Sequence, residues 1–150
     1  MTLADFKDIA TITGAIGTLI VAYFAYRVYR KNSNLERAKW LESLYEKFYE
    51  EDRLKAVREI TDSDDEYSRK KVDHFLENEP PEFTDYLNFF EFVAILEKNN
   101  QLTIEEVRDL FSYYLKSLHK WEKIRDYINR KENGFGKLRA LLGKMFPKEK

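Results

Sequence analysis

An uncharged run near the N-terminus limits what this chain can fold into more than any other feature. Ile9 to Tyr26 contains no charged residue in 18 positions, which is about 27 Å of helix at a rise of about 1.5 Å per residue. The hydrocarbon core of a bilayer is about 30 Å thick, so a helix of this length spans it when its flanking side chains reach the interface. An aromatic belt closes the run, made of Tyr23, Phe24, Tyr26 and Tyr29. The run therefore predicts one N-terminal transmembrane helix.

Two alternatives to a membrane span are a cleaved signal peptide and a buried helix of a soluble protein. A signal peptide needs a basic start and small residues at the cleavage site, whereas this chain has Asp5, Lys7 and Asp8 before the run and Tyr and Arg after it. The basic residues after the run are Arg27, Arg30, Lys31, Arg37 and Lys39, against Lys7 alone before it. The positive-inside rule then predicts a single-pass protein of the inner (cell) membrane with a cytoplasmic C-terminal domain. We expect an anchor with its flanks over residues 1–31 and a cytosolic domain over residues 32–150.

Small residues recur within the predicted span. Thr11, Gly14, Thr18 and Ala22 are the positions that we expect to pack against neighbouring spans or to line a pore. Small faces let helix backbones approach closely, and threonine hydroxyls can hydrogen-bond between helices. The pattern predicts a homo-oligomer in membrane lipid, although a lone helix can also carry Gly and Ala.

The rest of the sequence predicts an all-α fold. Five glycines and three prolines are few for 150 residues, and Leu, Glu, Lys and Arg are abundant, which favours helices. Helical spacing predicts elements over about 35–50, 52–61, 65–78, 82–98, 103–129 and 135–146. We therefore expect one transmembrane helix followed by a cytosolic bundle of about five to six helices, with residues 82–98 as its buried centre, Phe92 and Ile95 included. The turn Asp62-Ser63-Asp64-Asp65 is a plausible cap for the helix that follows it, and Thr103 with Glu106 matches a capping box.

Catalytic and metal-binding patterns are not found in the sequence. Cysteine is absent, which excludes thiolate and disulfide chemistry. His74 and His119, the two histidines, have no partner at ligand spacing. The chain also has no Gly-rich phosphate loop, and Ser112 and Ser117 lack a nucleophile-elbow context. We therefore expect no enzyme activity, no cofactor and no bound metal.

Charge is distributed unevenly along the chain. Residues 73–110 hold ten acids and two bases, and residues 112–150 hold eleven Lys or Arg and four acids. A candidate ligand-binding face consists of Lys116, Lys120, Lys123 and Arg130, interleaved with Tyr113, Trp121 and Tyr127. Cations neutralise phosphates and aromatic rings stack on bases, so a nucleotide or oligonucleotide is the expected ligand. In the alternative, the acidic and basic segments face each other and cancel, or the basic face is only solvated.

Three segments carry a resemblance to a known family. They are Arg-Ala-Lys-Trp-Leu-Glu-Ser-Leu-Tyr-Glu-Lys-Phe-Tyr (37–49), Asp-Tyr-Leu-Asn-Phe-Phe-Glu-Phe-Val-Ala (85–94) and Leu-Phe-Ser-Tyr-Tyr-Leu (110–115). Together with the N-terminal span, they resemble a family of small prokaryotic membrane-anchored helical proteins of unknown function, over nearly the whole chain. The build also resembles membrane effectors of antiphage signalling systems. The resemblance implies a fold and carries over no catalytic residue.

Two functions are compatible with these patterns. The first is an oligomeric membrane effector, whose cytosolic domain binds an anionic signal and whose bundled spans form a pore or perturb the membrane, as in antiphage defence. The second is a passive anchor or adaptor that holds a protein partner at the inner membrane surface. A defined oligomer in detergent favours the first function, and a monomer favours the second.

Overall fold

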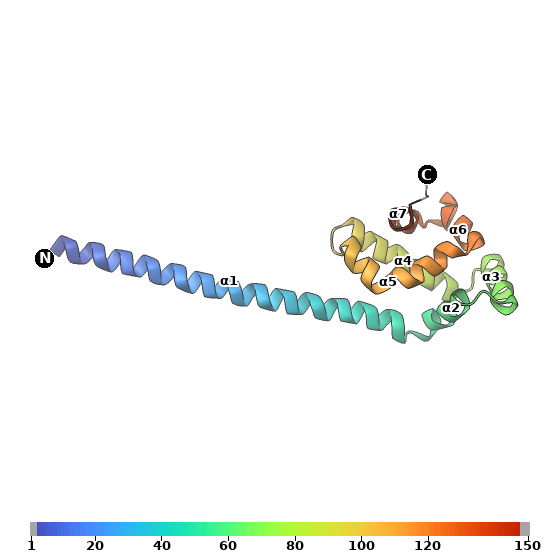
Figure 1. Ribbon diagram of the computed structural model, residues 1–150, viewed down its shortest axis with the longest axis horizontal. Helices are drawn as coiled ribbons and strands as arrows, with labels where there is room; N and C mark the ends of the chain where they lie inside the picture. The colour runs from blue at the N-terminus through green and yellow to red at the C-terminus, as the bar shows by residue number, and fades with distance from the viewer. Residues whose placement is uncertain (1–2, 148–150) are drawn as a thin grey trace. The chain divides into compact units, whose positions relative to one another are not determined.

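The computed structural model describes the backbone of residues 3–147 and the side chains of residues 21–147. Its elements are α1 (Leu3–Glu50), α2 (Asp52–Asp62), α3 (Glu66–Asn78), α4 (Pro81–Lys98), α5 (Ile104–Lys120), α6 (Glu122–Asn129), the short 3-10 helix η1 (Lys131–Asn133) and α7 (Gly136–Met145). No strand occurs between residues 3 and 147 (Figure 1). The prediction of an all-α fold is therefore confirmed. Two compact units meet inside α1, between Leu44 and Tyr45.

The first unit consists of α1 up to Leu44. This helix continues through Asn32, Ser33 and Asn34, because three polar residues weaken a helix without stopping it when good helix formers flank them. The predicted span Ile9–Tyr26 falls largely before Val21, and Thr11, Gly14 and Thr18 lie outside the residues whose side chains are described; Ala22 is exposed. Within the part of the chain described in full, no helix has a stretch long and apolar enough to cross a bilayer.

Side-chain caps start two helices of the second unit where the sequence predicts them, and a proline begins a third. Asp65 accepts a hydrogen bond from the Ser68 backbone N–H at 2.7 Å and so begins α3. Thr103 and Glu106 exchange hydrogen bonds in a full capping box at the start of α5. Pro81 occupies the first turn of α4, where a missing N–H costs nothing; the sequence predicts this start at Glu82, one residue later. The starts of α3 and α5 confirm what the sequence predicts.

The expected single helix over 103–129 is wrong, because the chain breaks at Trp121. This residue has an extended backbone, with φ −73° and ψ 101°, which ends α5 and begins α6. Its indole Nε1 donates a hydrogen bond to the Thr61 carbonyl at the end of α2, at 2.9 Å. The apolar spacing through Leu118, Trp121 and Ile124 continues across the break and no Gly or Pro marks it. The helical periodicity of the apolar residues therefore gives no sign of the break at Trp121.

Helix α4 is the centre of the second unit, as predicted. It packs against α2, α5 and α7 (Figure 1), and its fully buried side chains are Phe83, Tyr86, Leu87, Phe90 and Val93. The expectation that all apolar residues of this helix are buried is wrong at two positions. Phe92 is 48% exposed and Ile95 is 38% exposed, because none of the three packing helices covers that side of α4.

The last turn of α1 belongs to the core of the second unit. Phe48 is fully buried, and its ring lies 4.8 Å from the Tyr114 ring and 4.9 Å from the Phe89 ring. Arg58 of α2 donates hydrogen bonds to the carbonyls of Phe48 and Tyr49, at 3.1 and 3.3 Å. These carbonyls lack partners within the helix because α1 ends there.

Candidate functional site

The predicted ligand-binding face is divided between two helices. Lys116 and Lys120 lie on α5, and Lys123 and Arg130 lie on α6 or at its end. The break at Trp121 changes the direction of the chain between the two pairs. The four cations therefore do not form the single helical stripe that the sequence suggests.

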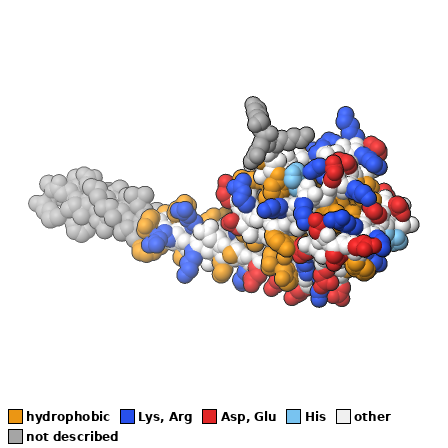
Figure 2. All heavy atoms as spheres, turned by 45° about the vertical axis from the view of Figure 1, so that its right-hand side comes forward, with side chains coloured by type: hydrophobic (Ala, Val, Ile, Leu, Met, Phe, Trp, Pro, Cys, Tyr) orange, Lys and Arg blue, Asp and Glu red, His pale blue; other side chains and the backbone are white. Residues whose placement is uncertain are grey.

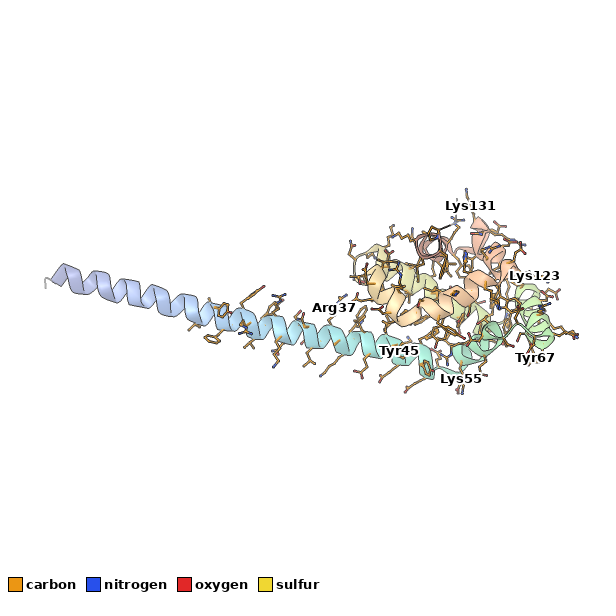
Figure 3. All side chains as sticks on the ribbon, in the orientation of Figure 1. Arg37, Tyr45, Lys55, Tyr67, Lys123 and Lys131 are labelled. Atoms are coloured by element: carbon orange, nitrogen blue, oxygen red, sulfur yellow. The ribbon has the colours of Figure 1, made fainter. Side chains whose placement is uncertain are left out.

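Two of these four cations already have carboxylate partners. Lys120 lies 3.4 Å from an Asp64 carboxylate oxygen, and the Lys123 ammonium bonds directly to Asp73 of α3. Lys123 is labelled in Figure 3. Among residues 21–147, no carboxylate lies within ion-pair distance of Lys116 or Arg130. An anionic ligand at Lys120 or Lys123 would have to compete with an internal carboxylate, whereas Lys116 and Arg130 remain available.

A hollow of about 330 Å³ lies between α3 and α6. It is lined by Asp73, Leu76, Glu77, Lys123, Asp126, Tyr127 and Arg130, so three carboxylates face two cations. The Tyr127 hydroxyl donates to Glu79 at 2.8 Å; burial, together with this carboxylate, raises the pKa of Tyr127 to about 12. The hollow is thus net acidic. The hydroxyl of its aromatic residue, Tyr127, is already bonded within the protein, so this residue is not presented for stacking on a base.

The acidic and basic segments of the chain face each other at several points. Besides Asp73 with Lys123, Glu97 accepts from Lys144 at 2.9 Å, and Glu91 accepts from the backbone N–H groups of Lys137 and Leu138. Figure 2 shows Lys and Arg side chains intermixed with Asp and Glu over the visible face of this unit. These contacts match the alternative in which the two segments largely cancel.

Both histidines of the chain contact neighbouring side chains of the domain. His74 contacts the Asn78 amide at 3.0 Å, and His119 stacks on Phe146 with ring centroids 5.0 Å apart. Burial, with a smaller effect of Arg125, lowers the pKa of His119. Within residues 21–147, no group of three or more His, Asp or Glu is placed to hold a metal ion.

A surface that the sequence marks only in part lies on α1, in the first unit. We call it the collar and define it as Tyr23, Phe24, Tyr26, Arg27, Val28, Arg30, Lys31 and Asn34, which line an open hollow of about 610 Å³. Its three aromatic rings are 57% to 60% exposed. Apolar and basic side chains adjoin each other there (Figure 2), and no Asp or Glu occurs from Val21 to Leu35.

A second unpredicted surface is the uncovered side of α4. Asn88, Phe92 and Ile95 follow one another at helical spacing and are all exposed. Beside them, Leu54, Phe89 and Phe92 contribute to a hollow of about 340 Å³ whose rim holds Lys47, Glu51 and Asp85. We call Phe92 and Ile95 the α4 patch. Sequence reasoning missed it because an apolar residue within a buried helix looks the same whether or not a neighbour covers it.

No protein-family model matches this chain, and neither a curated protein nor a solved structure was found to be similar to it. The resemblance described above therefore stays a prediction.

Proposed function

We propose that the protein is a single-pass protein of the inner (cell) membrane whose cytosolic α-helical domain is a non-catalytic adaptor that holds a protein partner at the membrane surface. In this proposal, residues 1–31 are the anchor with its flanks and residues 32–150 form the cytosolic part. The observation that supports it most is the collar. Tyr23, Phe24 and Tyr26 are exposed on a helix directly beside Arg27, Arg30 and Lys31.

The collar has the chemistry of a membrane interface. Tyrosine rings are enriched at the level of the lipid headgroups because one end is apolar and the other forms hydrogen bonds. Arginine and lysine extend their aliphatic stems along apolar surface while their charges reach water. An arrangement that leaves three aromatic rings exposed to water becomes favourable when those rings lie in an interface. The preceding uncharged run then lies in the bilayer core.

The adaptor part of the proposal is supported by the α4 patch. A half-exposed Phe beside an Ile, next to a hollow, is the kind of apolar anchor that carries much of the binding energy at protein interfaces. Among residues 21–147, no group of three or more His, Asp or Glu is placed to hold a catalytic metal ion.

The anchor is tested by membrane extraction and a topology reporter. We expect the full chain to stay in the membrane fraction through alkaline carbonate washing, since a spanning helix is not removed by disrupting charge contacts. A reporter that works only in the cytosol should be active when fused after Lys150. Release by carbonate, or activity of a periplasm-only reporter at that position, would contradict the proposal.

The adaptor function is tested in the same cells by placing a photo-crosslinking residue at Ile95. We expect one discrete protein adduct, which the substitution Phe92→Asp abolishes without changing the circular dichroism spectrum. Tyr113 on α5 is the matched control, because it is 59% exposed but lies outside the patch. The same adduct from position 113, or none from position 95, would remove the support for a partner at α4.

A second candidate is the oligomeric membrane effector that binds a nucleotide or oligonucleotide and perturbs the membrane. Lys116 and Arg130 favour it, because neither has a carboxylate partner in the described region. If this candidate is right, the detergent-solubilised protein is a defined oligomer, and Gly14→Leu or Thr18→Leu disrupts it. The double variant Lys116→Glu, Arg130→Glu should then lose nucleotide binding. A monomer that binds no nucleotide would support the adaptor function instead.

A further inference from the structure

The cations of the collar occupy one side of α1. Successive residues of an α-helix are rotated by about 100°, since 3.6 residues make a turn. Arg27, Arg30 and Lys31 therefore fall within an arc of about 100°. The same arc contains Tyr23, one turn before Arg27, and Asn34, one turn after Arg30. Because α1 is unbroken through these positions, the five side chains form one continuous face.

The opposite side of the helix at the same level carries no cation. Ala25, Tyr29 and Asn32 lie there at helical spacing. The collar is therefore not a symmetric ring of charge around the helix. A general requirement for positive charge at the end of a span would be satisfied by cations at any angle, so their confinement to one face calls for a partner on that side.

Within residues 21–147, the cationic face has no internal counter-charge. Glu36 is the first acidic residue after Val21. Among residues 21–147, no carboxylate lies within ion-pair distance of Arg27, Arg30 or Lys31. In the domain, Lys120, Lys123 and Lys144 each have a carboxylate partner, whereas Lys116 and Arg130 have none among residues 21–147. The open hollow of about 610 Å³ is lined by all five residues of this face and also by Phe24, Tyr26 and Val28.

We propose that this face binds the headgroups of anionic phospholipids, and that it gives the protein a preference for these lipids over zwitterionic ones. The inference rests on the proposed membrane anchor. The planar guanidinium groups of Arg27 and Arg30 match phosphate oxygens in pairs, and Lys31 adds a compact charge. The Tyr23 hydroxyl and the Asn34 amide supply uncharged hydrogen bonds to the same headgroups. The neighbouring Phe24 ring lies against acyl chains.

The test uses the full chain in nanodiscs that contain equal amounts of phosphatidylglycerol and phosphatidylcholine. Native mass spectrometry then counts the two lipids that stay bound. Each cation near an anionic surface favours binding about fivefold, so we expect the wild-type chain to retain several times more phosphatidylglycerol. The triple variant Arg27→Gln, Arg30→Gln, Lys31→Gln should retain the two lipids about equally. Equal retention by the wild-type chain would overturn the inference.

Two controls separate the face from charge in general. The variant Lys55→Gln, Lys70→Gln, Lys131→Gln removes the same charge from exposed positions of the domain and should keep the preference. The exchange Arg27→Val with Val28→Arg keeps composition and net charge but moves one cation by about 100° around the helix, and should weaken the preference. An unchanged preference in the exchange variant would overturn the one-sided face.

Failure of the anchor and failure of the lipid site give different results. If carbonate washing releases the wild-type chain from membranes, the proposed anchor fails and the lipid inference fails with it. If the chain resists carbonate but retains both lipids equally, the inference alone fails. If the triple variant does not insert, the ratio of the two retained lipids is compared between the wild-type chain and the single variant Arg30→Gln. A lower share of phosphatidylglycerol in the variant supports the inference, and an equal share contradicts it.

Discussion

At the scale of single residues, Arg58 is the charged side chain that the described fold buries most deeply, at 7% exposure. Its guanidinium bonds the last carbonyls of α1 and lies 4.5 Å from the centre of the Tyr49 ring. Arg58→Met should lower the free energy of unfolding by about 2–4 kcal/mol, because buried carbonyls lose charged donors. Urea unfolding of the full chain in detergent measures this. Arg53→Met, at an exposed ion pair, should cost at most about 1 kcal/mol; equal losses would contradict this role of Arg58.

At the scale of elements, α7 is begun by a residue of another helix. Glu91 of α4 accepts hydrogen bonds from the backbone N–H groups of Lys137 and Leu138, at 3.0 and 2.6 Å, and so does the work of an N-cap. Glu91→Ala should destabilise the protein by about 1–3 kcal/mol, and Glu91→Gln by less, since one acceptor remains. Hydrogen exchange should show the loss first in α7. Glu59→Ala, at an exposed position of α2, is the control; protection of α7 that survives Glu91→Ala would refute the cap.

At the scale of the whole molecule, the chain divides at Tyr45, inside a helix rather than in a loop. Phe48 lies beyond that division, in the core of the second unit. A chain that starts at Tyr45 should therefore fold cooperatively, whereas one that starts at Asp52 should not, because it lacks this ring and the carbonyls that Arg58 bonds. Phe48→Ala in the full chain should cost about 3–5 kcal/mol. Thermal unfolding, monitored by circular dichroism, compares the chain that starts at Tyr45 with the chain that starts at Asp52. Equal stability of these two shortened chains would exclude this role of Phe48.

The candidate sites divide between the two sources of information. The composition of the collar can be read from the sequence. The placement of its three cations on one side of the helix follows once α1 is known to be unbroken. The availability of Lys116, Lys120, Lys123 and Arg130 could not be predicted, because it depends on carboxylates about 50 residues away, such as Asp73. The exposure of Phe92 could not be predicted either, since it depends on which side of α4 the neighbouring helices leave uncovered.

The sequence by itself determined the all-α class and the starts of α3 and α5. Their signals, in the turn of residues 62–65 and at Thr103, act on backbone groups within one helical turn, so neighbours in the chain suffice to specify them. Only the tertiary structure decided the break at Trp121 and the cap at Glu91. Each depends on a hydrogen bond between residues 46 to 60 positions apart, and such a bond exists only after packing has brought the two helices together.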